Sequence, residues 1–201
     1  MKKLCVLIFA LMLPMVASAQ AFVEGQNYQV VRQQATAKPQ VTEFFSLYCP
    51  HCYAFEQIFE KMEKSMPDVA FKRVHVAFLG GDMGEEMVRA YAVAEVLGVN
   101  KKMVPAFFDA IHVKHTPITS RNDIRQIFID NGIASGEEFD SAVNSFAVNG
   151  LVAQMNKSVE DYQIQGVPTV IVNGKYQVEP SSVSNVGEYI SLVKYLAHKK
   201  D

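Results

Sequence analysis

The order of apolar and polar positions predicts strands at both ends of the chain and helices between them. Two stretches rich in β-branched and aromatic residues, NYQVV (27–31) and VTEFFSLY (41–48), predict strands. Residues 50–65 predict a helix, because their apolar side chains recur at helical spacing: Phe55, Ile58, Phe59 and Met62. VAFKRVHVAF (69–78) predicts another strand. Together they form a β-α-β unit, whose two strands are expected to be parallel.

After Gly80 and Gly81 the pattern is helical for about seventy residues. The predicted helices are 83–97, 101–114, 120–130, 137–146 and 151–161. Two of them open with a serine followed three residues later by an acid, which is the pattern of a capping box. These pairs are Ser120 with Asp123 and Ser135 with Glu138.

Strand composition returns in GVPTVIVNGKYQV (166–178), where Asn173-Gly174 predicts a hairpin turn, and 184–199 predicts a closing helix. This order predicts an α/β fold: a central mixed sheet flanked by helices, with an inserted all-helical domain. We assign 20–81 and 153–201 to the sheet-containing domain and 82–152 to the insert. An insert of this size is expected to cover or flank the active end of the sheet.

The first nineteen residues, MKKLCVLIFALMLPMVASA, have the pattern of a cleavable signal peptide, with cleavage after Ala19. The apolar run from Leu4 to Val16 is too short for a membrane anchor, which needs roughly 20 residues. Removal of 1–19 leaves 17 basic against 21 acidic residues, a net charge of −4. No clustered basic face is expected, so nucleic acid is not an expected partner.

The exported chain keeps only Cys49 and Cys52, in an oxidising compartment. A C-x-x-C pair can be a zinc half-site, a structural disulfide or a redox centre. A disulfide across so short a loop adds little stability through chain entropy, which favours reversible redox chemistry. The zinc alternative would need His112 and His115 as further ligands. They are more simply surface residues near a helix end, and we expect no metal.

The cysteines fall at a strand-to-helix junction, with Pro50 suited to the first helical turn. The helix N-terminus favours a thiolate at Cys49, and His51 adds a second source of positive potential. A stabilised thiolate stabilises the reduced protein, so the disulfide form is expected to be an oxidant. An exposed His51 without an electrostatic role is the plainer alternative.

The segments FFSLYCPHCYAFE, GGDMG and GVPTVIVNGKYQV together resemble the DsbA family of periplasmic thiol oxidants, which has a thioredoxin-like fold. The resemblance covers essentially the whole exported chain. It implies a monomeric enzyme of the Gram-negative periplasm with no cofactor beyond the redox-active Cys49–Cys52 disulfide. It also implies donation of this disulfide to reduced, unfolded, newly exported polypeptides, and reoxidation by a DsbB-like, quinone-linked inner-membrane protein.

Two other functions compete with the oxidant. A disulfide isomerase or reductase of the same compartment would have to be kept reduced, and such isomerases resemble dimers with an added N-terminal domain. Only about twenty residues precede VTEFF after cleavage. A non-enzymatic chaperone or metal carrier using the same cleft is the third alternative.

The resemblance also implies roles for residues outside the cysteine pair. Glu43 matches a buried acid beneath the second cysteine that relays a proton, although a strand-end Glu reaching solvent is the simpler alternative. Pro168 is implied to be cis and to lie against the cysteines, with the backbone of Val167 free to pair with an extended substrate. Arg73 departs from the family's buried lysine: it can pair with Glu43 but cannot release a proton.

Overall fold

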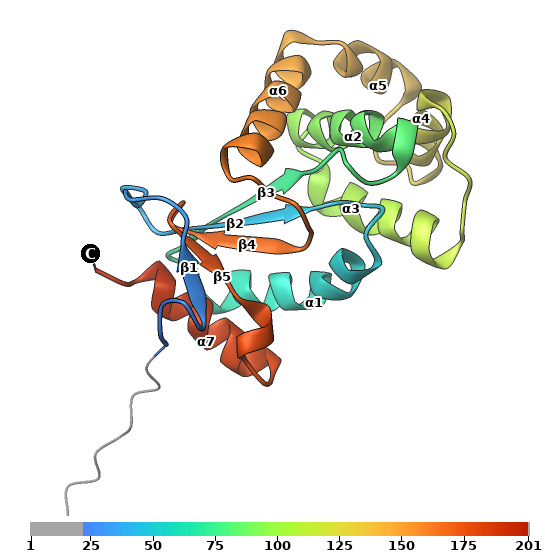
Figure 1. Cartoon of the computed structure of the whole chain (residues 1–201). Helices are drawn as coiled ribbons and strands as arrows, with labels where there is room; N and C mark the ends of the chain where they lie inside the picture. Colours follow the sequence, from blue (N-terminus) through green and yellow to red (C-terminus); the bar gives the residue numbers. More distant parts are fainter. Residues whose placement is uncertain (1–21, 201) are drawn as a thin grey trace, which may run out of the picture.

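The computed structural model describes residues 22–200, so the predicted signal peptide lies outside the described residues. The strands are β1 (Tyr28–Val30), β2 (Gln40–Phe45), β3 (Ala70–His75), β4 (Thr169–Val172) and β5 (Tyr176–Val178). The α-helices are α1 (Pro50–Ser65), α2 (Gly84–Val96), α3 (Asn100–Phe108), α4 (Arg121–Asp130), α5 (Gly136–Val143), α6 (Phe146–Asp161) and α7 (Val186–Ala197) (Figure 1). Shorter helical turns are η1 (Gly81–Met83), η2 (Asp109–Val113) and η3 (Pro180–Ser182). Within residues 22–200 no helix has the length and apolar character to span a bilayer.

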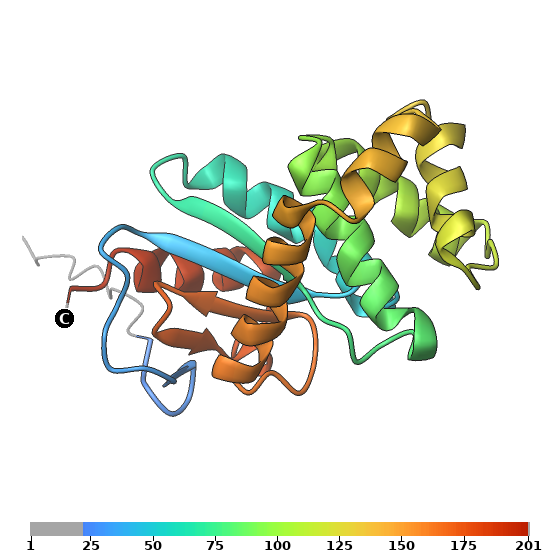
Figure 2. The same cartoon turned by 90° about the horizontal axis from the view of Figure 1, so that it is seen from above.

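The five strands form one mixed sheet in the order β1-β5-β4-β2-β3. β2 and β3 are parallel, as the β-α-β pattern predicted, while β4 runs antiparallel to both β2 and β5. The five helices α2–α6 lie between β3 and β4 in the chain and group at one end of the sheet (Figures 1 and 2). The predicted mixed sheet with an inserted helical unit is therefore confirmed.

Helices cover the sheet on both faces because alternate residues of its central strands point to opposite sides. Val41 of β2 packs with α1 and α7 in one buried cluster, which includes Phe59 and Leu192. Phe44 points the other way and packs beside Tyr162 at the end of α6. The strand β2 is thus buried on both faces, and any charge along it lies in the interior.

The predicted Asn173-Gly174 turn joins β4 to β5, with φ angles of 53° and 63°. The Asn173 side chain is buried, and both its oxygen and its nitrogen form hydrogen bonds. Its oxygen accepts the backbone N–H of Gln40, and its amide nitrogen donates to the carbonyls of Leu196 and Ala197. The turn therefore also anchors the last turn of α7 to the start of β2.

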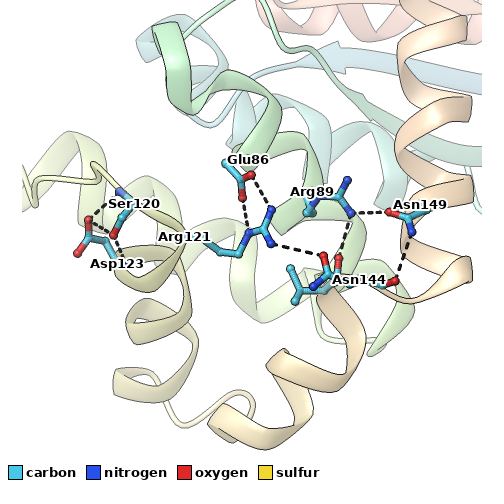
Figure 3. A network of polar contacts seen from close by, with 8 residues as sticks. Glu86, Arg89, Ser120, Arg121, Asp123, Asn144 and Asn149 are labelled. Carbon is cyan, nitrogen blue, oxygen red and sulfur yellow. Dashed lines mark hydrogen bonds and ion pairs between the residues drawn. The ribbon is translucent and has the colours of Figure 1, made fainter.

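The helices of the insert are tied together by a polar network centred on two arginines (Figure 3). Arg121 of α4 binds both carboxylate oxygens of Glu86 in α2 at 2.7 Å, and it reaches Asn144 after α5 at 3.4 Å. Arg89 of α2 donates to Asn149 of α6 at 2.7 Å. The insert is held together by these contacts and by an apolar core that also includes Phe45 and Leu47.

Both predicted capping boxes are present, at Ser120 and at Ser135. Three predicted helix boundaries are wrong, one of them the start of the helix predicted over 151–161, which begins at Phe146. The helix predicted over 137–146 ends at Val143, because Ser145 caps a new helix that begins at Phe146. The helix predicted over 101–114 is regular only to Phe108, and the next five residues form the wider π-helical turn η2. Helix α6 runs unbroken past residue 152, and the division of the chain at this position stays a prediction.

Candidate active site

Cys49 caps the N-terminus of α1. It has an extended backbone conformation, Pro50 follows in the first helical position, and the Cys49 Sγ accepts the backbone N–H of Cys52 at 3.2 Å. The sulfur therefore takes the place that a Ser or Asp oxygen has in most helix caps. Both cysteines are free thiols in the structure. A thiolate at this position meets both a backbone N–H donor and the positive end of the helix dipole.

The two thiols differ in their surroundings. Cys49 is 4% exposed and Cys52 is fully buried, while Pro50 and His51 between them face solvent. Burial raises the pKa of the Cys52 thiol far above its ordinary value, and its contact with Cys49 and the nearby Glu43 raise this pKa further. Cys52 is therefore a protonated thiol in the reduced protein, and Cys49 is the sulfur nearer to the surface.

The loop before β4 brings a distant segment onto Cys49. The Val167–Pro168 peptide bond is cis, and the carbonyl oxygen of Val167 lies 3.5 Å from the Cys49 Sγ. Val167 and Pro168 are half-buried. The structure thus brings together the cysteine pair and the Val-Pro pair, which are more than a hundred residues apart in the sequence.

Glu43 is completely buried in the centre of the sheet, so it does not reach solvent. Its neighbour in the β2–β3 register is Arg73, whose Nε lies 2.8 Å from a Glu43 carboxylate oxygen. The N–H does not point along this contact, which makes it an ion pair rather than an aligned hydrogen bond. Burial raises the pKa of Glu43 to about 8, and the Arg73 guanidinium partly opposes this rise.

Arg73 has a second acidic partner that the sequence analysis missed. Its guanidinium binds both carboxylate oxygens of Glu56 on α1, and it lies 4.1 Å from the centre of the Phe59 ring. Glu56 is one helical turn after Cys52. The pattern of α1 identified its apolar face but gave no reason to select this acid.

Two histidines also reach the active-site loop: His75 was not selected from the sequence, and His112 was considered only as a zinc ligand. His75, at the end of β3, accepts the backbone N–H of Leu47 on its Nε2 at 2.9 Å, and burial lowers the pKa of His75 to about 3. His112 in η2 donates from its Nε2 to the Leu47 carbonyl at 2.8 Å. His75 lies beside Phe45 in the β2–β3 register, which only the structure shows. No sequence pattern pointed to the contact of either histidine with Leu47.

The prediction that His112 is a plain surface residue is therefore wrong: it is half-buried against the active-site loop. His115, three residues on, is exposed. Among residues 22–200 no three His, Cys, Asp or Glu side chains group as metal ligands.

A cysteine pair at a helix N-terminus, faced by a cis-proline loop and supported by a mixed sheet, defines a thioredoxin-fold thiol–disulfide oxidoreductase. The family model described as "DSBA-like thioredoxin domain" matches residues 40–190. The chain belongs to the DsbA family, and the resemblance stated from its sequence is confirmed. As a member it is a thiol:disulfide oxidoreductase, which confirms the predicted enzyme class.

Curated DsbA proteins match this chain over their full length. The chain is 42% identical to "Thiol:disulfide interchange protein DsbA" of Escherichia coli and of Dickeya dadantii, with all of each chain covered. Among solved structures, DsbA of Proteus mirabilis has a TM-score of 0.81 at 40% identity, covering 89% of this chain and 98% of that one. A further structure holds Proteus mirabilis DsbA with a non-covalently bound peptide, PWATCDS, at 38% identity and a TM-score of 0.80.

Proposed function

We propose that this protein oxidises newly exported polypeptides in the periplasm of a Gram-negative bacterium by donating its Cys49–Cys52 disulfide to them. One observation carries the proposal: the Cys49 sulfur lies at a helix N-terminus, between the N–H of Cys52 and the carbonyl of Val167. Both groups can take part in thiol–disulfide exchange. The N–H stabilises the thiolate that the reaction releases, and the Val167 loop offers backbone groups to a peptide.

The reaction moves two electrons from the substrate to the protein. A substrate thiolate attacks the Cys49 sulfur, the Cys49–Cys52 bond breaks, and Cys52 leaves with the electron pair. A second substrate thiolate then attacks its partner's sulfur in the mixed disulfide and releases the Cys49 thiolate. The substrate ends with a disulfide and the protein with two reduced cysteines.

The buried Cys52 needs a proton when it leaves, because burial disfavours its thiolate. Glu43 is the acid that we propose to supply it. Its pKa of about 8 keeps much of the carboxyl protonated at neutral pH, and when it is ionised its charge raises the pKa of Cys52. Arg73 keeps its own proton throughout, so the path does not run through it.

A substrate segment would lie extended along the loop before β4. Val167 would pair with it through backbone groups, next to the sulfur that is attacked. The peptide bound to the Proteus mirabilis relative, which contains a cysteine, supports this class of substrate. Reoxidation requires an acceptor for two electrons, for which we propose a DsbB-like, quinone-linked inner-membrane protein. The signal-peptide pattern of residues 1–19 supports the periplasmic location.

The thiol–disulfide equilibrium with glutathione tests this function. Because the chain has no Trp, mass-tagged thiols or tyrosine fluorescence would report the redox state. An oxidant remains largely reduced in a glutathione buffer that oxidises ordinary structural cysteines, and it transfers its disulfide to a reduced peptide. A protein that is oxidised in that buffer and reduces or reshuffles disulfides would instead support the isomerase or reductase alternative.

A further inference from the structure

We propose that His112 is a positioning residue through which the helical insert holds the Cys-Pro-His-Cys turn in its reactive conformation. The inference rests on the proposed function, because it concerns the same cysteine pair. It starts from the peptide groups of Leu47, in the loop that links β2 to Cys49. From the insert, His112 reaches this loop through the hydrogen bond between its Nε2 and the Leu47 carbonyl at 2.8 Å.

Leu47 is held from two sides. On the sheet side, its N–H donates to His75 at 2.9 Å, and on the insert side its carbonyl accepts from His112. The Leu47 side chain is buried as well. A carbonyl can only accept, so the His112 Nε2 carries a proton in both the neutral and the charged ring. The bond to Leu47 is therefore kept in either charge state.

His112 also contacts the other end of the active-site turn. Its ring stacks on Tyr53, the residue after Cys52, with centroids 5.3 Å apart and planes within 6° of parallel. Phe108 packs against both rings. The Tyr53 N–H in turn donates to the Cys49 carbonyl at 3.0 Å. One side chain of the insert thus contacts residues on both sides of the cysteine pair.

The backbone around His112 departs from regular helix at this point. In η2 the N–H of Lys114 bonds to Asp109, five residues back, and that of Thr116 bonds to Ala110, six residues back. Such wide turns interrupt α-helices mainly where a functional group has to be placed. Here the wide turn carries His112, whose ring reaches both Leu47 and Tyr53.

Loss of the His112 donor would leave a carbonyl in the active-site loop without its partner and would loosen the approach to Cys49. The contact between Cys49 Sγ and the Cys52 N–H stabilises the reduced form and depends on that loop. The couple should therefore become less oxidising. A hydrogen bond of ordinary strength corresponds to a change of about 3- to 10-fold in the equilibrium constant.

The test separates the donor of His112 from its ring. His112→Phe keeps an aromatic ring over Tyr53 without the donor, and His112→Gln keeps a donor without the ring. His115→Asn, at an exposed position three residues away whose φ of 53° Asn tolerates, is the control. For each folded protein one measures the glutathione equilibrium, the rate of disulfide transfer to a synthetic dithiol peptide, and the free energy of unfolding.

We expect His112→Phe to shift the equilibrium about 3- to 10-fold toward the oxidised protein and to slow transfer, and His112→Gln to restore most of both. His115→Asn should match the wild type. Wild-type values in His112→Phe, or a change in unfolding alone, would overturn the positioning role. If the Phe variant does not fold, His112→Ala makes the same comparison without added bulk. A wild-type protein that transfers no disulfide refutes the proposed function instead.

Discussion

Glu43 and Arg73 face each other across the parallel strands β2 and β3, with a carboxylate oxygen of Glu43 2.8 Å from the Arg73 Nε. Glu43 is completely buried, and the Arg73 side chain is 12% exposed. Arg73 also binds Glu56, so one cation is shared by two acids. The positive charge of Arg73 only partly offsets the effect of burial on Glu43, and the pKa of Glu43 rises to about 8.

This raised pKa predicts that the fold loses stability as pH rises. The unfolded carboxyl has a pKa of 4.5, so folding binds a proton between about pH 4.5 and pH 8. The contribution is fully present below the unfolded pKa and is lost as pH rises through the folded one. Urea unfolding of the oxidised wild type should show a slope of up to about 1.4 kcal/mol per pH unit within this window, relative to Glu43→Gln. Glu137→Gln, at an exposed position, should keep the wild-type slope.

Removal of Arg73 should destabilise the protein strongly. Above pH 8, where Glu43 is ionised, Arg73→Met leaves this buried carboxylate without its cation, and breaking a buried pair in this way costs about 3–5 kcal/mol. The double variant Arg73→Met/Glu43→Leu removes both charges and should recover most of that loss in denaturant unfolding. A double variant no more stable than Arg73→Met would show that the ion pair itself, rather than the unpaired charge, carries the stability.

The different surroundings of the two thiols predict distinct roles. Cys49 is the sulfur beside the Val167 loop and should carry the mixed disulfide, whereas the buried Cys52 should resolve it. When mixed with a disulfide-bonded peptide, Cys52→Ala should therefore accumulate a covalent complex, because Cys49 attacks the peptide disulfide, one peptide thiol leaves, and no Cys52 is present to release the other; the complex is visible on non-reducing gels. Cys49→Ala should form none, and the opposite result would reverse the assignment.

The exposed His51 is predicted to make the disulfide more oxidising, because its positive potential supports the Cys49 thiolate. His51→Ala should shift the glutathione equilibrium toward the oxidised protein. His51 is exposed, so unfolding of the oxidised protein should change little, within about 0.5 kcal/mol. An equilibrium identical to the wild type would remove His51 from the mechanism.

Reduction should stabilise the fold at pH 7. In the reduced protein the Cys49 sulfur accepts the Cys52 N–H and meets the positive end of the helix dipole, and both contacts stabilise the fold. The small loop means that opening the disulfide frees little unfolded-chain entropy. Denaturant unfolding of both redox forms checks this. A reduced form clearly less stable than the oxidised one is the behaviour of a structural disulfide and would contradict the oxidant.

Much of the fold was readable from the chain because it depends on neighbouring residues. The serine caps at Ser120 and Ser135 and the Asn173-Gly174 turn are local hydrogen-bonding or backbone preferences, and each is present as predicted. The position of Cys49 at a helix start follows equally from Pro50 and the apolar spacing of α1. The boundary at Ser145 was missed, although its capping hydroxyl is also a local signal.

The sequence by itself determined the elements, their order and the redox pair, since strand and helix periods and a C-x-x-C are properties of short segments. The tertiary structure alone decided what surrounds that pair. It set the carbonyl of Val167 against Cys49, and it placed His112 on Leu47 from a separate helical unit. It also buried the Glu43 side chain completely, which no local pattern specifies. The physical reason is that burial and contacts between distant segments arise only when the whole chain packs, and the pKa of Glu43 follows from that packing.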